Sequence, residues 1–253
     1  GLIEWQPQDE TALFLLRNVR YYYDNANWEE SFKSAQPLEG QAGSGRPLAL
    51  PLDTTGGSAI IELANTTDST QAVSFSLYDD EGDMLDSGTL TLGAHRTHHL
   101  ITDAILAGEK GIAVVQGSTT GGLIAVAMHY GRTPSGGIRY IYGLSAKEPL
   151  GQTLRSSYNT FLEQGCRLLL VNPSPASAGA LLTITRDDGT ELVAGEALSV
   201  AAHGLLDLDL CGNDAADNYG VVTVQAQTAN TLTGAVLRLG KNDQYRFPTP
   251  LRQ

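Results

Sequence analysis

Short stretches in which apolar and polar residues alternate recur along most of the chain. In residues 72–78, Val73, Phe75 and Leu77 fall on one face of an extended strand, and the residues between them fall on the other. This alternation is typical of strands with one face on a core and one face toward water. Strands at a spacing of about 8–15 residues, separated by Gly and Asp turns, predict an antiparallel β-sandwich. Residues 100–109 have room for a single helical turn.

The chain contains this pattern of strands and turns twice. Residues 59–65 (AIIELAN) and residues 166–172 (CRLLLVN) each open the same series of features. A polar run and an alternating strand follow, then an acidic turn that ends in Gly, an Ala-His pair, a strand led by Gly and a last apolar strand. The offset between the copies is 107 residues at the first landmark and 109 at the last. Such a slow drift predicts two diverged copies of one domain with small differences in loop length.

The fold class predicted is therefore all-β, with two tandem antiparallel β-sandwich domains behind an N-terminal extended leader. We assign residues 1–57 to the leader, 58–146 to the first repeat, 147–157 to a linker and 158–253 to the second repeat. The leader has three interpretations: strands that add to the first sandwich, the tail of a preceding module, or a donor strand that completes a sheet in a neighbouring subunit. The donor-strand candidate is the apolar run Ala12, Leu13, Phe14, Leu15 and Leu16.

Both cysteines of the chain, Cys166 and Cys211, lie in the second repeat. A bridge between them would tie two strands of one sandwich, and it would stabilise the fold by roughly 4 kcal/mol on the chain-entropy model. Two buried free thiols are the alternative. An even cysteine count in a chain of secreted character favours the bridge.

Several turn and strand positions recur in both copies. A strand ends in Asn65 or Asn172, an acidic turn closes at Gly82 or Gly189, and small residues precede the next strand. A Gly-led strand then reaches Gln116 or Gln225. In this pattern, which covers residues 54–253, the unit resembles a β-sandwich module found in tandem in bacterial secreted and cell-surface proteins. The resemblance implies a non-catalytic, immunoglobulin-like building block with no active-site residues to carry over.

Charge and composition limit the classes of partner that we expect for this chain. The formal net charge is −12, with 42% apolar and 17% charged residues, so the chain is globular and acidic. Nucleic acid is not an expected partner, because phosphate binding favours basic proteins. No apolar run approaches the ~18 residues of a membrane span. The chain begins with Gly and shows no signal peptide, so we expect its start to be a processed end or a cut within a longer protein. We expect an extracellular or cell-surface location in bacteria.

Two groups of residues are weak candidates for a metal. His95 and His99 would share a face if the HRTHH segment were one strand, although a polar strand face explains them equally well. The acidic turns, Asp79 with Asp80 and Asp187 with Asp188, offer oxygens for a structural Ca²⁺, while hairpin turn chemistry accounts for the same residues. We predict no other cofactor.

Aromatic residues gather near the start of the chain. A sugar-binding module uses exposed rings as stacking platforms, and buried or interface aromatics are the other interpretation. The glycan-stacking candidates are Trp5, Tyr21, Tyr22, Tyr23 and Trp28.

No catalytic constellation is visible in the sequence. There is no G-x-S-x-G elbow and no phosphate-binding loop. We therefore predict a non-catalytic extracellular structural or interaction protein, such as a spacer, an adhesive stalk or a fibre subunit, with other protein subunits or surface components as partners. The alternatives are a carbohydrate-binding module that uses the N-terminal aromatics and, third, a hydrolase with a site between the domains.

Overall fold

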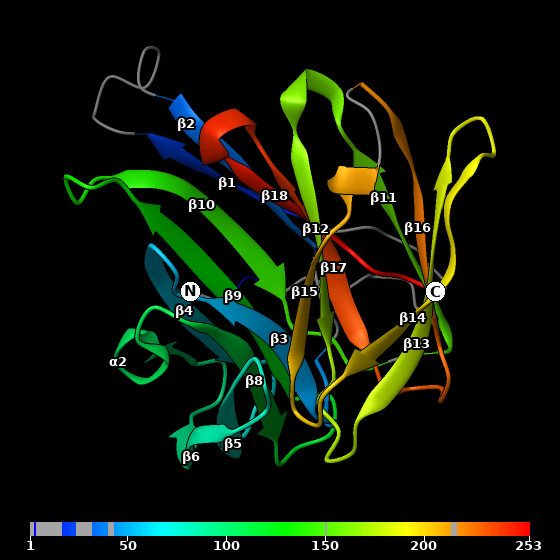
Figure 1. The fold of residues 1–253 in the computed structure, drawn as a ribbon. Coiled ribbons are helices and arrows are strands. Elements are labelled where there is room, and N and C mark those ends of the chain that lie inside the picture. The colour runs from blue at the N-terminus through cyan, green and yellow to red at the C-terminus, as the bar shows by residue number, and fades with distance from the viewer. Residues whose placement is uncertain (1–2, 4–16, 24–31, 40–42, 150, 214–216) are drawn as a thin grey trace, which may run out of the picture.

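The computed structural model describes residue 3 and residues 17–23, 32–39, 43–149, 151–213 and 217–253. Nearly all of the described chain is in antiparallel strands, and the prediction of an all-β sandwich fold is confirmed (Figure 1). The donor-strand candidate Ala12–Leu16 and the tryptophans Trp5 and Trp28 lie outside the described residues. Among the helices of the described ranges, none has the length and apolar character that crossing a membrane requires.

The first sandwich consists of eight strands in two sheets. One sheet has the order β10-β9-β4-β7, with β10 (Ile138–Ser145), β9 (Leu123–Arg132), β4 (Gly57–Asn65) and β7 (Thr97–Ile101). The other has the order β3-β8-β5-β6, with β3 (Leu48–Asp53), β8 (Lys110–Gly117), β5 (Gln71–Asp79) and β6 (Met84–Leu92). Both sheets contribute to one core, which includes Leu50, Ile61, Val73 and Ala125. The predicted helical turn is the helix α2 (Asp103–Leu106).

The second sandwich repeats this strand order in both of its sheets. One sheet runs β15-β12-β17-β18, with β15 (Leu205–Asp209), β12 (Gly165–Val171), β17 (Thr233–Leu239) and β18 (Arg246–Pro250). The other runs β11-β16-β13-β14, with β11 (Thr153–Asn159), β16 (Tyr219–Ala226), β13 (Ala178–Arg186) and β14 (Glu191–Val200). They share a separate core that includes Leu168, Leu182, Val224 and Val236. The 3-10 turns η1 (Phe161–Glu163), η2 (Cys211–Asn213) and η3 (Lys241–Asp243) lie between its strands.

Two strands lie wholly or mostly outside the ranges that the sequence suggested for the repeats. The strand β3 falls within the predicted leader, yet it pairs with β8 and its leucines belong to the first core. The strand β11 starts in the predicted linker, ends two residues into the predicted second repeat, and pairs with β16. Ahead of them, β1 (Arg17–Tyr23) and β2 (Phe32–Glu39) form a two-stranded sheet of their own, and β2 lies beside β10. Tyr21, Tyr22 and Tyr23 belong to β1, and the structure describes their backbone only.

A buried asparagine organises the same turn in each sandwich. The side-chain amide of Asn65 donates to the carbonyls of Ser69, Leu92 and Gly93, and its oxygen accepts from the backbone N–H of Thr67. Asn172 does the same with equivalent residues, because its amide donates to Ala176, Val200 and Ala201 and its oxygen accepts from Ser174. Each asparagine thus satisfies buried backbone groups where two strands end.

Candidate functional site at the seam between the sandwiches

The two sandwiches pack side by side through the outer faces of unlike sheets (Figure 1). The first sandwich contributes the β3-β8-β5-β6 sheet together with β10, and the second contributes the β15-β12-β17-β18 sheet. We call this contact layer the seam. Its apolar centre is a third buried cluster drawn from both sandwiches: Ala49, Tyr78, Ile112, Tyr140, Tyr142, Leu144, Leu169, Val171, Leu205, Ala235 and Leu237. Side chains that alternation would direct toward water are therefore buried against the other sandwich.

Charged groups cross the seam at two places. Asp207 of β15 accepts hydrogen bonds from Lys110 of β8 and from Arg167 of β12, so one carboxylate joins both sandwiches. Asp207 is only 11% exposed, so its charge is shielded from water and depends on these partners. Alternation in the segment LLDLDL (residues 205–210) would by itself turn Asp207 toward water, and the first sandwich covers it instead.

Arg246 of β18 makes the second charged link. Its guanidinium contacts Asp53 of β3 at 3.0 Å and Asp243 at 2.8 Å, and it lies 4.3 Å above the centre of the Tyr140 ring. Burial on its own would raise the pKa of Asp53, but hydrogen bonds from Thr55 and the charge of Arg246 together hold that pKa below its ordinary value. The Asp53 carboxylate therefore stays ionised as a partner for Arg246.

His129 of β9 lies beside this pair and is fully enclosed. Its ring stacks on Tyr142 with centroids 4.3 Å apart, and neither ring nitrogen makes a hydrogen bond of good geometry within the described chain. Burial lowers the pKa of His129 to about 4, while the nearby Asp53 carboxylate opposes that shift. The imidazole is consequently neutral at neutral pH, and protonating it would place a charge in an apolar layer.

Burial has the opposite effect on the tyrosines of the same layer. It raises the pKa of Tyr140 to about 12, and it raises the pKa of Tyr142 well above its ordinary value. Both phenols are therefore neutral wherever the protein is folded at ordinary pH. Beside the small group of ion pairs, the seam thus holds a neutral imidazole and two neutral phenols.

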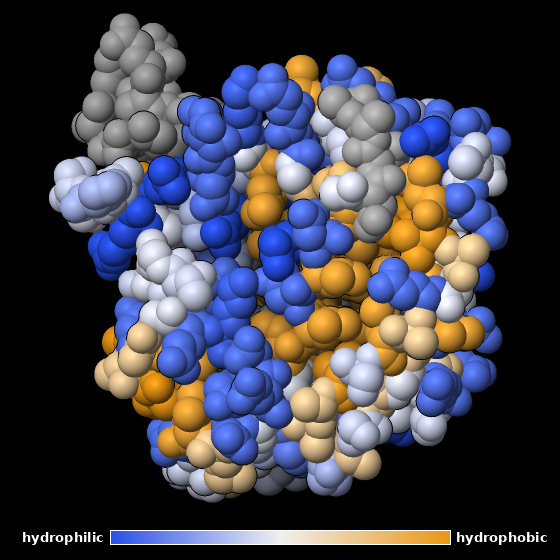
Figure 2. All heavy atoms as spheres, viewed as in Figure 1, coloured by the Kyte–Doolittle hydropathy of each residue, from blue (hydrophilic) through white to orange (hydrophobic). Residues whose placement is uncertain are grey.

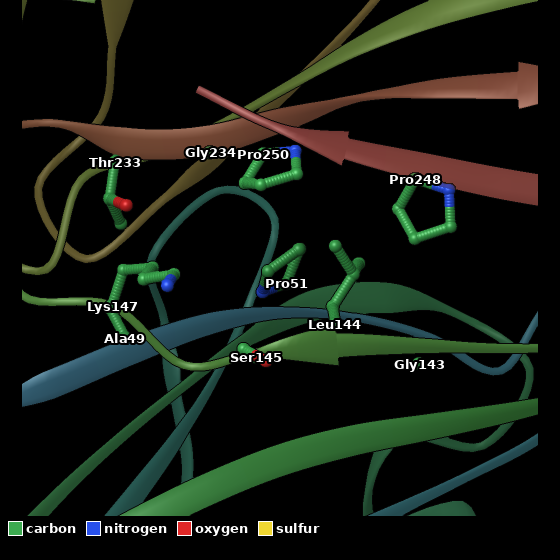
Figure 3. A pocket seen from close by; sticks show the side chains of 10 residues that line it. All are labelled: Ala49, Pro51, Gly143, Leu144, Ser145, Lys147, Thr233, Gly234, Pro248 and Pro250. Carbon is green, nitrogen blue, oxygen red and sulfur yellow. The ribbon is translucent and has the colours of Figure 1, made fainter. Parts of the chain in front are cut away.

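Two small cavities open along the seam. One, of about 10 Å³, is lined by His129, Asp53, Lys110, Tyr142 and Asp207, and it has the size of about one water molecule. The other, of about 50 Å³, lies among the edge strands, where Pro51 and Leu144 of the first sandwich approach Pro248 and Pro250 of the second (Figure 3). A few water molecules would fill it. This geometry suits contact between the sandwiches rather than enclosure of a substrate.

A short backbone contact closes the seam at one end. The acidic turn of the first sandwich meets the Ala202-His203 turn of the second, where the Leu205 N–H donates to the Asp80 carbonyl at 2.9 Å and Tyr78 stacks on His203 at 4.4 Å. Gly82 adopts a φ of +97°, and a Cβ there would collide with the Ala202 carbonyl. The glycine of this turn is needed for the close approach as well as for the turn itself.

The predicted metal candidates lie in different places. The prediction that His95 and His99 share a strand face is wrong, because His95 occupies a left-handed turn with φ of +51° and its ring contacts Asp68 at 2.8 Å. His99 is on β7, with its ring 4.0 Å from Glu62. Within the residues that the structure describes, no three His, Cys, Asp or Glu side chains are gathered as metal ligands.

The acidic turns use their carboxylates locally. Asp79 accepts hydrogen bonds from the backbone N–H groups of Gly82 and Asp83, both at 2.8 Å. Asp188 accepts from Thr190, and these hydrogen bonds lower the pKa of Asp188. Asp80 meets the seam through its carbonyl, and Asp187 lies next to Tyr219. The Ca²⁺ site stays a prediction, because ordinary hairpin chemistry already accounts for these bonds.

The structure pairs Cys166 with Cys211 in a disulfide, with the two Cα atoms 5.3 Å apart. The bridge links the start of β12 to the turn η2 that follows β15. It lies within the second sandwich, away from the charged groups of the seam.

Sequence reasoning did not identify the residues of the seam. A signal was present in part, since His129 lies within the apolar run LIAVAMHYG and Asp207 within LLDLDL. Charged or titratable residues inside apolar strands point to a second buried surface. The partners Lys110, Arg246 and Asp53 stand at strand ends, where charged residues are ordinary, so nothing in the sequence marked them.

Comparison with known proteins gives little more. No protein-family model and no curated protein matches the sequence. Among solved structures, the chain is similar to a Streptomyces avermitilis α-L-rhamnosidase complexed with L-rhamnose. The identity is 11%, the match covers 83% of this chain and 26% of that chain, and the TM-score is 0.24.

The chain is also similar to a β-glucuronidase from glycoside hydrolase family 2, with 14% identity, 80% of this chain and 23% of that chain covered, and a TM-score of 0.18. A Bacteroides uniformis β-glucuronidase matches with 13% identity, 80% of this chain and 25% of that chain covered, and a TM-score of 0.18. The chain spans about a quarter of the length of each of these enzymes. Likeness at these TM-scores carries no argument about function.

Proposed function

We propose that this protein is a non-catalytic structural or interaction protein, in which two immunoglobulin-like sandwiches act as one rigid body. The observation that carries the proposal is the seam. An apolar layer from seven strands is bordered by two neighbouring ion pairs that cross it, Lys110–Asp207 and Asp53–Arg246. A flexible pair of domains would instead leave such side chains to water.

The polar groups of the seam support a structural role. Asp207 and Asp53, the two carboxylates of the small cavity, each contact cationic partners, and the cavity has room for about one water molecule. A general acid or base needs a free position next to a substrate. Ion pairs that are shielded from water instead favour one arrangement of the surfaces they join.

The proposed location is outside the cytoplasm. A disulfide persists in oxidising compartments, and an acidic surface suits an extracellular protein. A spacer, a stalk or a fibre subunit needs a fixed distance between its binding surfaces, which a rigid pair of sandwiches would supply.

The experiment that tests the proposal measures the distance between the sandwiches. Spin labels on the exposed positions Thr89→Cys of β6 and Glu196→Cys of β14 would report this distance with the native disulfide intact. We expect one narrow distribution, which broadens when Asp207→Ala removes the shared carboxylate. Asp68→Ala, at a fully exposed carboxylate, is the matched control and should leave the width unchanged.

Two outcomes would overturn the proposal. A broad distribution in the unsubstituted protein would mean that the seam does not hold in solution. Turnover of any glycoside or ester that disappears in Asp53→Asn or Asp207→Asn would make the seam an active site.

A further inference from the structure

Four apolar side chains gather on the surface of the second sandwich, away from the seam. Phe161 and Leu162 belong to η1, and Tyr219 and Val221 belong to β16. Leu162 is 77% exposed and the other three are 40–49% exposed. The rings of Phe161 and Tyr219 lie 6.1 Å apart at an angle of 35°. We call these four residues the apolar patch.

Hydrogen bonds hold the backbone under the patch. The hydroxyl of Thr160 donates to the Asn218 carbonyl at 3.1 Å and accepts from the Asn218 N–H at 2.9 Å. Next to it, the Phe161 N–H donates to the Asn159 side chain at 2.7 Å, and the Leu162 N–H donates to Asp217 at 3.2 Å. Phe161 and Leu162 are thus presented to solvent by a fixed loop rather than by a loose one.

The first sandwich shows that the fold does not require this loop. Thr54 makes the same pair of hydrogen bonds there as Thr160 makes in the second sandwich. Its hydroxyl donates to the Glu109 carbonyl and accepts from the Glu109 N–H. There the chain turns through Gly56, which has a φ of +69° and no side chain to strain.

The second sandwich turns instead through Leu162 and Glu163, which have φ values of +59° and +57°. Side chains other than glycine are strained in this left-handed region, and such strain persists where the surrounding structure fixes the backbone, which is common at binding sites. A strained, rigid and exposed leucine is therefore a sign of an interaction surface.

The charges around the patch are acidic. Tyr219 hydrogen-bonds through its hydroxyl to Asp187, Asp188 follows in the same turn, and Asp217 lies beneath Leu162. The nearby basic groups already face carboxylates, since Lys241 contacts Glu163 at 2.6 Å and Arg186 lies near Asp188. A second copy docked through the same patch would set these carboxylates against each other, whereas a basic partner would complement them.

We propose that the apolar patch docks a different protein, through a segment that combines apolar side chains with Arg or Lys. Leu162 and Phe161 are the anchors that pack against the apolar side chains, and Asp187, Asp188 and Asp217 meet the basic ones. The tilted rings and the protruding leucine suit a protein segment better than the flat face of a sugar ring. This inference rests on the proposed role as an interaction protein and names one of its surfaces.

The test uses a library of random dodecapeptides displayed on phage as the probe and the full chain as bait. We expect enrichment of peptides that combine apolar residues with Arg or Lys. Their affinity should fall at least tenfold for Leu162→Gly and for Phe161→Ser, and it should weaken with added salt. Ile101→Ser is the matched control, because Ile101 is an exposed apolar residue of the first sandwich, and it should bind as the unsubstituted protein does.

Stability separates an interaction role from a structural one. Leu162→Gly should keep or raise the unfolding midpoint, because glycine relieves the strained φ, while peptide binding is lost. A lowered midpoint would make Leu162 part of the fold and would overturn the proposal.

Three further outcomes would also overturn it: enriched peptides without basic residues, binding that survives Leu162→Gly, and self-association or sugar binding that depends on the patch. Failure here with a narrow label distance across the seam would leave the proposed function standing. Catalytic turnover at the seam would remove the proposed function whatever the peptides do.

Discussion

The two sandwiches close the same pair of positions with different chemistry. In the first, the Ala59 N–H donates to the Asp103 carboxylate at 2.9 Å, and Asp103 opens the helix α2. In the second, the positions equivalent to Ala59 and Asp103 are Cys166 and Cys211, which are joined by the disulfide. The equivalence follows from the backbone, because the Thr102 N–H donates to the Ala59 carbonyl as the Leu210 N–H donates to that of Cys166.

The two closures place different elements against the core. The helix α2 places Leu106 in the first core at 1% exposure, with the partly buried Ile105 packed beside it. As Phe75, Leu90 and Leu100 are in the first sandwich, Leu192, Val193, Leu206 and Leu208 are partly buried in the second, which has the turn η2 in place of the helix. Figure 2 shows hydrophobic side chains at the surface over β15 and toward β14, where these residues belong. Strand order is thus common to both copies, while the closure of each sandwich is a local solution.

Breaking the disulfide should have the largest effect. We expect Cys166→Ala with Cys211→Ala to destabilise the second sandwich by about 4 kcal/mol, because the bridge closes a loop with a sequence separation of 45 residues. Hydrogen exchange measured strand by strand should show lost protection in β12 and β15, with β4 and β9 much less affected. Equal loss in both sandwiches would contradict this comparison.

Removing the helix side chain is the corresponding change in the first sandwich. Leu106→Ala should cost about 3 to 4 kcal/mol in the free energy of unfolding, since a fully buried leucine leaves a cavity. Denaturation with urea would measure the loss, and protection should now fall in β4 and β6. The exposed Leu162→Ala provides a control of the same chemistry, without a cavity.

Acid should weaken the first sandwich through His129. In the strand register His129 pairs with Ala59, and the equivalent pair in the second sandwich is Arg238 with Cys166, so the second sandwich has no histidine at this position. The pKa of His129 is about 4 in the folded state, against about 6.5 for an ordinary histidine. The unfolded chain therefore binds a proton between these values and the folded protein does not. Above pH 6.5 the free energy of unfolding is not lowered by His129. It falls by up to about 3 kcal/mol as the pH drops toward 4, and His129 lowers it no further below that pH.

The lowered pKa of Asp53 acts in the same direction, but only at lower pH, as its carboxylate is protonated. Free energies of unfolding at pH 7 and pH 4.5 would measure the histidine effect. His129→Phe should flatten the profile between pH 6.5 and 4, whereas His99→Gln, at an exposed site, should not change it. An unchanged slope in His129→Phe would show that His129 is not the titrating group.

The smallest effect concerns the two turns that follow Thr54 and Thr160. Gly56→Leu should destabilise the first sandwich by about 1 kcal/mol, because it places a side chain at a φ of +69°. Leu162→Gly should stabilise the second sandwich by about 0.5 to 1 kcal/mol, by removing the same strain. Thermal unfolding would measure both, and a destabilised Leu162→Gly would mean that the two turns are not comparable.

The predictions from sequence succeeded where the physics was local. Alternation gave the strands, and the 107-residue offset gave two copies whose strand orders agree throughout. The bond between Cys166 and Cys211 was one of two alternatives that the sequence left open, and the structure shows it. Pro248 and Pro250 lie in β18, where proline is tolerated because the outer side of an edge strand needs no N–H donors.

The chain pattern alone was enough to indicate an all-β protein built twice from one plan, because period-2 alternation and turn residues act within a few positions of each other. It could not indicate which outer faces would be covered. Tyr78, Leu205 and Asp207 look like solvent-facing residues until the second sandwich lies against the first. Their burial depends on residues more than ninety positions away, so it belongs to the folded assembly of both sandwiches.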